Sequence, residues 1–243
     1  MSIVTIHSQY DDKGIMIEKP IISASDAADK IKDGNSVMVG GFLNCGSPHT
    51  IIFALKEKNT KNLTLICNDS AIHNLKTGVI TGLAHLVENK MFRKIITSHI
   101  GTNQETQRQM NAGETEVELV PQGTLAEQIR AGGAGLGGIL TPTGIGTEVA
   151  CDKQIILVNH HSFLLELPLK ADVAIIKARK ADKAGNLVFN GTARNFNPLM
   201  ATAAELVIAE VEEIVEVGEI DPNEIHTSSI FVDFLVKAEQ FDY

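Results

Sequence analysis

Short apolar runs that alternate with helix-like segments constrain the fold of this chain more than any other feature. Val37–Val39 is such a run, and Gly40-Gly41 follows it directly. A segment with helical spacing comes next and carries Ile51 and Leu55 on its apolar face. Apolar runs without polar alternation are typical of parallel strands that are buried on both faces. The order strand, glycine turn, helix therefore predicts an α/β fold on a largely parallel open sheet flanked by helices.

The same alternation continues along the chain. A helix is expected at 24–31, capped by Ser23 or Ser25 and ended by Gly34. Ser47-Pro48 is interpreted as the cap and first residue of the next helix. The further predicted strands are Leu63–Ile66, Lys94–Thr97, Glu116–Val120, Val173–Lys177, Asn186–Phe189 and Leu206–Glu210, with Cys67–Ser70 as a polar turn. The further helices are expected around Leu83–Val87, Asn103–Ala112 and Thr124–Arg130.

One part of the chain predicts an antiparallel section. Gln154–Val158 and Ser162–Leu167 are two strand-like runs joined at Asn159-His160, which is the pattern of a hairpin. No repeat, low-complexity tract or linker interrupts the order of elements. Residues 1–243 are therefore interpreted as one domain.

Composition excludes several classes of function. The 21 Lys and Arg residues against 30 Asp and Glu give a net charge of −9, whereas a nucleic-acid binder would carry a basic face. No stretch approaches the roughly 20 apolar residues of a membrane span, and residues 1–14 lack the pattern of a secretory signal. Cys45, Cys67 and Cys151 are odd in number and form no CxxC pair, so reduced thiols and a cytoplasmic location are expected. The eight histidines lack HxH and HxxxH spacing, so no metal site is expected.

The strongest local signal is the segment Asp33–Pro48, in which glycines lie between a strand and a helix. Glycines after a strand let a ligand approach the backbone, and the N-terminus of the following helix offers free N–H groups to an anion. In open α/β sheets such loops lie at the ligand-binding edge. A tight turn without a ligand is the alternative interpretation of Gly40-Gly41.

Three other signals are given structural interpretations. Gly133–Gly138 matches GxGxxG but follows a helix, so it is interpreted as a loop for close backbone packing. Cys45 is interpreted as a small residue in a crowded loop, because the helix is expected to carry His49 away from it. The acidic residues from Glu205 to Glu219, including Glu210, are interpreted as a solvated face.

The whole segment Asp33–Pro48 resembles the signature of the family I coenzyme A transferases: D-G, two free positions, three apolar residues, G-G-F, three free positions and G-x-P. Three further blocks look like family sequence in the same order, and the resemblance extends from about Ser23 to about Lys237. They are Thr97–Asn103, Glu116–Gly133 and Thr192–Pro198.

The resemblance implies a CoA-transferase/NagB-like fold and the alpha subunit of a heteromeric short-chain enzyme. Such an enzyme moves CoA from an acyl-CoA to a carboxylate such as acetate, butyrate or acetoacetate, with CoA as substrate and no permanently bound cofactor. The resemblance assigns two amides, Asn68 and Gln122, to the acyl pocket, where they orient a carboxylate. It assigns CoA contact to Gly40, Gly41, Phe42, Leu43, Asn44, Cys45 and Gly46.

The nucleophile that the family requires is missing from this chain. The family's glutamate lies in a Glu-Asn-Gly context, but here Glu88-Asn89 precedes Lys90 in a helix-like segment. The resemblance therefore implies that a beta subunit supplies the glutamate in an α2β2 complex, with ping-pong transfer through a glutamyl-CoA thioester. Two alternatives remain open: a sugar-phosphate isomerase of related fold, and a non-catalytic CoA-binding or scaffold protein.

Overall fold

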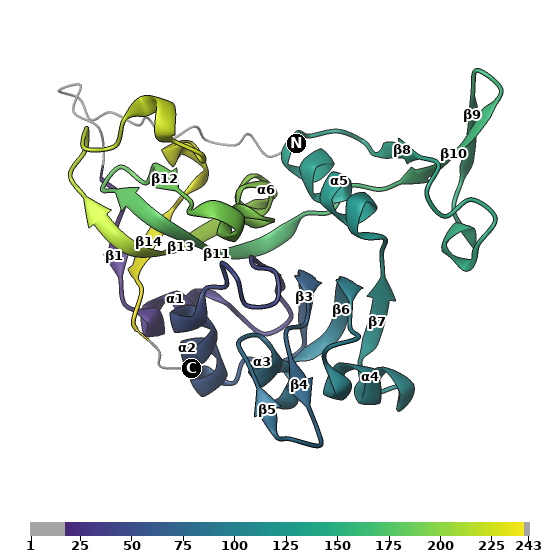
Figure 1. The fold of residues 1–243 in the computed structure, drawn as a ribbon, viewed down its shortest axis with the longest axis horizontal. Helices are drawn as coiled ribbons and strands as arrows, with labels where there is room; N and C mark the ends of the chain where they lie inside the picture. Colours follow the sequence, from purple (N-terminus) through teal and green to yellow (C-terminus); the bar gives the residue numbers. More distant parts are fainter. Residues whose placement is uncertain (1–17, 241–243) are drawn as a thin grey trace.

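A nine-stranded sheet runs through the computed structural model, which describes residues 18–240 (Figure 1). The absence of a secretory signal was predicted from residues 1–14, which lie outside the described residues. All neighbouring strands of the sheet are parallel except β12, which pairs antiparallel with β11. In spatial order the strands are β1 (Ile21–Ile22), β14 (Phe234–Lys237), β13 (Ala204–Val215), β11 (Ala171–Asp182), β2 (Ser36–Val39), β3 (Leu63–Asp69), β6 (Phe92–His99) and β7 (Glu116–Leu119), with β12 (Leu187–Val188) beside β11.

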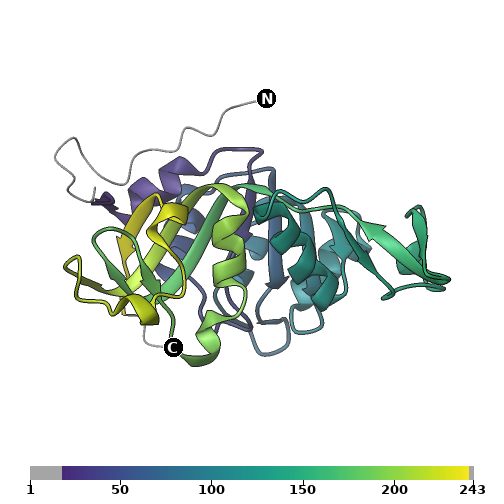
Figure 2. The same cartoon turned by 90° about the horizontal axis from the view of Figure 1, so that it is seen from above.

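Helices cover both faces of this sheet, as Figures 1 and 2 show. Helices α1 (Ala24–Lys30), α2 (His49–Lys58) and α3 (Ala84–Glu88) pack on one face, and α5 (Gln122–Gly133) and α6 (Asn197–Thr202) on the other. Strand β2 is buried on both sides, since Val37 and Val39 join the first core and Met38 joins the second. The predicted α/β architecture is confirmed. The remaining helices are α4 (Gln104–Asn111) and the 3-10 turns η1 (Glu148–Ala150), η2 (Gly191–Arg194), η3 (Pro222–Glu224) and η4 (Ser229–Phe231).

The predicted antiparallel section forms an arm that projects from the body (Figures 1 and 2). Its sheet has the order β8 (Ile139–Thr141), β10 (His161–Glu166), β9 (Ile155–Val158). Asn159 and His160 form the β9–β10 turn with φ of 49° and 64°, the left-handed pair that a two-residue hairpin requires. A second small hairpin consists of β4 (His73–Asn74) and β5 (Val79–Ile80).

The predicted ends of two helices need correction. Ser23 caps α1 as expected, because its Oγ accepts the Asp26 N–H at 3.0 Å, but the helix ends at Lys30. Gly34 lies beyond that end, in the turn to β2. Helix α2 begins at His49 with Pro48 in the cap position, one residue later than the predicted Ser47 cap.

The ends of other helices and strands differ from the predicted ends because of tertiary contacts. Cys67–Asp69 was predicted as a turn but continues β3, since β6 extends alongside it as far as His99. Helix α5 extends to Gly133, beyond the predicted Arg130. The close packing predicted for Gly133–Gly138 is confirmed at its two ends. A Cβ would lie 2.1 Å from the Thr202 Oγ1 at Gly133 and 2.8 Å from the Glu166 carbonyl oxygen at Gly138. Strand β7 is a mostly exposed edge strand rather than a half-buried one.

The direction in which successive strands are added to the sheet reverses between β2 and β11. The chain proceeds from β2 to β3 on one side, and from β11 to β13 on the other. The two neighbours share the register Val37–Val173, and Gly40 N–H then donates to the Ile175 carbonyl at 3.0 Å. Ligands of open α/β sheets bind at such a switch point, beside the carboxyl ends of the strands. The loop Gly40–Gly46 lies at this position, as the sequence predicted.

Candidate functional site

The segment Gly40–Gly46, called the glycine loop below, is a tight turn with an exposed tip. Phe42 and Cys45 exchange two backbone hydrogen bonds of 3.0 and 2.9 Å, and Leu43 and Asn44 lie between them with φ of 43° and 71°. Left-handed backbone is unusual for leucine, whereas asparagine adopts it readily. The Phe42 and Leu43 side chains are 42% and 40% exposed. The fold thus presents two apolar side chains at this edge of the sheet.

Asn197, the first residue of α6, fastens the base of this loop. Its Nδ2 donates to the Gly46 carbonyl at 3.0 Å, and its Oδ1 accepts the Lys177 N–H at 3.0 Å. A Cβ at Gly40 would lie 1.8 Å from the same Oδ1. Gly40 is therefore required by the protein's own packing, so a ligand is not needed to explain it.

Three amides of the loop are left without an acceptor. Within residues 18–240, the N–H groups of Gly41, Asn44 and Gly46 donate to no other residue. Backbone N–H groups grouped in a turn bind anionic oxygens well. Gly41 is buried, whereas Asn44 and Gly46 are partly exposed, so the loop can offer hydrogen bonds to a ligand through the amides of these two residues.

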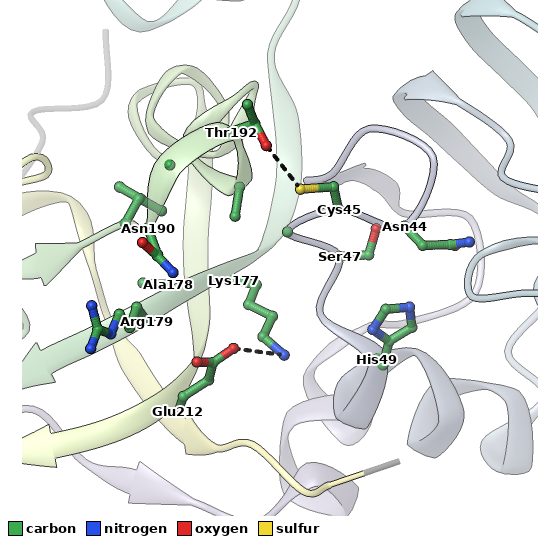
Figure 3. A pocket seen from close by; sticks show the side chains of 14 residues that line it. Asn44, Cys45, Ser47, His49, Lys177, Ala178, Arg179, Asn190, Thr192 and Glu212 are labelled. Atoms are coloured by element: carbon green, nitrogen blue, oxygen red, sulfur yellow. Dashed lines mark hydrogen bonds and ion pairs between the residues drawn. The ribbon is translucent and has the colours of Figure 1, made fainter. Parts of the chain in front are cut away.

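A cavity of about 520 Å³ opens between the glycine loop, β11 and η2 (Figure 3). In its wall the Cys45 Sγ lies 3.4 Å from the Thr192 Oγ1. His49 lines the same cavity from the start of α2, but its imidazole lies apart from the Cys45 thiol in Figure 3. The lining residues are Asn44, Cys45, Gly46, Ser47, His49, Lys177, Ala178, Arg179, Phe189, Asn190, Gly191, Thr192, Ala193 and Glu212.

A buried carboxylate lies beside this cavity. Glu210 on β13 is fully buried, and its Oε1 lies 3.4 Å from the Lys177 Nζ, which also lies 3.6 Å from Glu212 Oε1. The interpretation of the acidic run as a solvated face is wrong for Glu210. The pairing of Glu210 with Lys177 could not be predicted from the sequence, because only the register of β11 with β13 brings the two residues opposite each other.

Glu210 also occupies the N-terminus of α2. Its Oε2 accepts the Ile51 N–H at 3.2 Å. The expectation that this helix end presents free N–H groups to a ligand is wrong there, because the protein's own carboxylate takes the place of the anion. Burial raises the pKa of Glu210, while the Lys177 ammonium and the Ile51 N–H act in the opposite direction.

His49, the first residue of α2, is held in its neutral form. Burial and the nearby Lys177 and His85 lower its pKa to about 4. A neutral imidazole can donate or accept a hydrogen bond at neutral pH without adding charge to the cavity.

Asn68 and Gln122 meet at the neighbouring strand end. Gln122, the first residue of α5, donates from Nε2 to the Asn68 Oδ1 at 2.7 Å. Asn68 is 1% exposed, whereas Gln122 is exposed. The Ser98 Oγ donates to the Asn68 carbonyl oxygen at 2.7 Å. Two residues that are 54 positions apart in the sequence therefore form one polar pair.

Asp69 connects this pair to the glycine loop. Its Oδ2 accepts the Asn68 Nδ2 at 2.8 Å and the Leu43 N–H at 3.0 Å. The prediction placed Asp69 in a polar turn and gave it no role. A carboxylate three residues after the apolar run Leu63–Ile66, at the carboxyl end of a predicted parallel strand, was the signal that could have identified it.

The described residues contain no group of three or more His, Cys, Asp or Glu side chains placed to hold a metal ion. None of their helices is long and apolar enough to cross a membrane. Glu88 and Asn89 lie at the end of the short helix α3, in agreement with the helical context expected for them.

Comparison with known sequences identifies close relatives. Residues 21–238 match the family model described as coenzyme A transferase. The chain is 47% identical over 220 residues to the acetate CoA-transferase subunit alpha of Escherichia coli, which covers 90% of this chain and 97% of the relative. It is also 47% identical over 206 residues to the acetoacetyl-CoA:acetate/butyrate CoA transferase alpha subunit of Clostridium acetobutylicum, covering 85% and 92% of the two chains.

Solved structures share the fold. An acyl-CoA transferase from E. coli O157:H7, crystallised as a thioester complex with CoA, superposes with a TM-score of 0.79 at 20% identity over 91% of this chain. This chain spans about half of that protein, 47% of its length. Glutaconate coenzyme A-transferase from Acidaminococcus fermentans superposes with a TM-score of 0.77 at 20% identity over 90% of this chain and 75% of that one. The family match over 21–238 and the identity to full-length relatives agree: the chain belongs to the coenzyme A transferase family.

Proposed function

We propose that this chain is the alpha subunit of a heteromeric short-chain acyl-CoA:carboxylate CoA-transferase that acts on acetate, butyrate or acetoacetate. The observation that carries the proposal is the 47% identity across 97% of a relative named subunit alpha of acetate CoA-transferase. The single-chain acyl-CoA transferase is about twice as long as the part that this chain matches. A partner chain of similar size accounts for that difference.

In this proposal the glycine loop contacts CoA. The contact residues are Gly40, Gly41, Phe42, Leu43, Asn44, Cys45 and Gly46, as the family resemblance suggests. The amides of Asn44 and Gly46 support this role because they are in partly exposed residues and have no acceptor within the described chain. Such N–H groups stabilise the oxyanion that develops on a thioester carbonyl during acyl transfer, which is a large contribution in reactions of this class.

Asn68 and Gln122 line the acyl pocket in this proposal. Their hydrogen bond of 2.7 Å joins two amides that stay neutral at every pH of interest. Neutral amides orient a carboxylate without competing for its proton. Asp69 joins Asn68 to the Leu43 N–H of the glycine loop, and this connection supports a shared pocket for thioester and acid.

The nucleophilic glutamate comes from the beta subunit of an α2β2 complex. It attacks the acyl-CoA carbonyl and expels the CoA thiolate, which leaves a mixed anhydride of the acyl group and the glutamate. The thiolate then attacks the glutamyl carbonyl, so that the donor acid leaves as its carboxylate and a glutamyl-CoA thioester remains. The acceptor carboxylate runs the same two steps in reverse, which forms the new acyl-CoA and restores the glutamate. CoA enters and leaves as substrate, and no permanently bound cofactor takes part. We place the complex in the cytoplasm, because Cys45, Cys67 and Cys151 are free thiols, as a reducing compartment leaves them.

Co-expression with a beta subunit that carries a Glu-Asn-Gly segment tests the proposal. The purified complex is mixed with acetoacetyl-CoA, and each chain is searched by mass spectrometry for a glutamyl-CoA adduct. We expect the adduct on the partner and transfer of CoA to acetate or butyrate by the complex only. Full transfer by this chain alone, or an adduct on this chain, contradicts the division of labour.

The same preparation separates the two alternatives. A sugar-phosphate isomerase would be stabilised against heat by a sugar phosphate rather than by CoA. A non-catalytic CoA-binding or scaffold protein would bind CoA but form no adduct with any partner.

A further inference from the structure

Asp69, the last residue of β3, is buried and accepts three hydrogen bonds from three different parts of the site. Its Oδ2 accepts the Leu43 N–H at 3.0 Å and the Asn68 Nδ2 at 2.8 Å, and its Oδ1 accepts the Ala71 N–H at 2.9 Å. The side chain is 6% exposed. No lysine, arginine or histidine in residues 18–240 forms an ion pair with it. Three neutral N–H donors therefore fix the position of the carboxylate, and the carboxylate fixes the positions of the groups that carry them.

The bond to Leu43 supports an unfavourable backbone conformation. Leu43 has φ of 43°, in a region that side-chain-bearing residues other than Asn and Asp rarely adopt. The charge-assisted hydrogen bond from its N–H to Asp69 lies at the tip of the glycine loop. Strained backbone at a functional site persists only where surrounding contacts impose it, and Asp69 provides such a contact.

The bond to Asn68 fixes which way that amide points. An ionised carboxylate only accepts hydrogen bonds, so Asn68 must turn its NH₂ toward Asp69. Its Oδ1 is then left to accept the Gln122 Nε2 at 2.7 Å. Asp69 thereby sets the orientation of the amide pair.

We infer that Asp69 is a positioning residue that couples the glycine loop to the amide pair, so that both are presented to one substrate in a fixed relation. Its effect on the loop and the amides follows from the contacts alone, whereas its effect on CoA transfer rests on the proposed function. Misplacing groups around a reacting centre by about 1 Å costs on the order of a hundredfold in rate.

Asp69→Asn is the informative variant, because all three partners of the carboxylate are donors. The NH₂ of the asparagine must therefore face either the Ala71 N–H or both the Leu43 N–H and the Asn68 NH₂, and the charge assistance of every bond is lost. The chain offers a matched control in Asp182→Asn. Asp182 also ends a strand and is 3% exposed, and its carboxylate accepts two hydrogen bonds from Asn186, of 2.9 and 2.8 Å. It has no contact with the glycine loop. If Asp69→Asn does not fold, Asp69→Ser replaces it, since serine removes the charge without adding an amide donor.

Hydrogen–deuterium exchange of peptides that cover Phe42–Cys45 is measured in the complex with the beta subunit, or in the full chain if no complex forms. We expect exchange at least about tenfold faster in Asp69→Asn than in the wild type, and no change in Asp182→Asn. Exchange equal to the wild type, or equally fast in both variants, overturns the inference whether or not the protein transfers CoA.

Kinetics of the complex give the second readout. We expect kcat to fall about ten- to a hundredfold in Asp69→Asn, with KM for acyl-CoA within about threefold of the wild type. Leu43→Gly relieves the strain of the left-handed backbone. In a Leu43→Gly protein, the fall in kcat caused by Asp69→Asn should therefore be at least about threefold smaller than in the wild type. An equal fall in kcat with and without Leu43→Gly contradicts the inference that Asp69 supports the backbone of Leu43. A wild-type complex without transfer activity refutes the proposed function, and the exchange experiment still decides the role of Asp69.

Discussion

The Lys177 ammonium lies 3.4 Å from the Glu210 carboxylate, and the two residues are direct partners in the register of β11 with β13. Glu210 has no exposed surface, and its other oxygen accepts the Ile51 N–H at the start of α2. One carboxylate thus balances both a helix N-terminus and Lys177, which lines the cavity of Figure 3. The helix that follows the glycine loop is fixed to the centre of the sheet by this contact.

Lys177→Met should destabilise the protein by about 3–5 kcal/mol, because it leaves the buried Glu210 carboxylate without an opposite charge. Urea unfolding measures the change. Lys183→Met is the control, since Lys183 and its partner Glu216 form an exposed pair, and its unfolding midpoint should equal that of the wild type. The double variant Lys177→Met/Glu210→Met should recover most of the loss, since replacing both partners of a buried pair is often nearly neutral. A single Lys177→Met variant as stable as the wild type would contradict the role of the pair.

Gly40→Ala should prevent the glycine loop from packing on α6. Its Cβ would lie 1.8 Å from the Asn197 Oδ1, which is far inside van der Waals contact. We expect a loss of at least about 2 kcal/mol in unfolding free energy and loss of CoA transfer. Gly123→Ala is the matched control, because nothing lies within 4 Å of the new Cβ on α5. It should be neutral or stabilise the helix by up to about 1 kcal/mol. Equal stability of the two variants in thermal unfolding would refute the packing argument.

The fold could be predicted largely because its signals are local. The apolar run at Val37–Val39 and the turn residues Asn159-His160 each specify their own conformation, whatever surrounds them. The strand boundary at Cys67–Asp69 could not be predicted in this way. Whether a polar residue after a run stays in the sheet depends on the length of its neighbour β6, which the local sequence does not reveal.

Sequence patterns pointed to the glycine loop and the two amides of the candidate site, but not to its buried carboxylates. The glycine loop and the two amides Asn68 and Gln122 carry recognisable sequence patterns. Glu210 lies 33 residues from Lys177 in the sequence, and only the parallel register places them opposite each other. Asp69 was overlooked for a related reason: its partner Leu43 is on another strand end, 26 residues earlier.

Gln122→Glu should weaken the binding of the acceptor carboxylate rather than the fold. Gln122 is exposed at the start of α5, so the thermal midpoint should hardly change. The new carboxylate would face the Asn68 Oδ1 and repel an anionic substrate, so KM for acetate or butyrate should rise about tenfold or more. Gln154→Glu, on the exposed arm, is the control and should leave KM unchanged. An unchanged KM in Gln122→Glu would remove Gln122 from the proposed acyl pocket.

His49 should make the stability of the protein fall as the solution becomes acidic. Its pKa is lowered to about 4 in the folded chain, against about 6.5 when unfolded. Between these values the unfolded chain binds the proton and the folded chain does not, so stability is complete above pH 6.5 and is lost as pH falls toward 4. The loss amounts to about 3 kcal/mol at 1.36 kcal/mol for each pH unit. Urea unfolding at several pH values measures it.

The comparison with His49→Gln isolates this effect, because other titrating groups, including Glu210, contribute to both proteins. The wild type should lose about 3 kcal/mol more than His49→Gln between pH 6.5 and 4. His161→Gln, at an exposed position at the start of β10, should retain the full wild-type dependence. Parallel curves for the wild type and His49→Gln would show that the His49 imidazole accepts a proton as easily in the folded chain as in the unfolded one, against the burial of its ring beside Lys177.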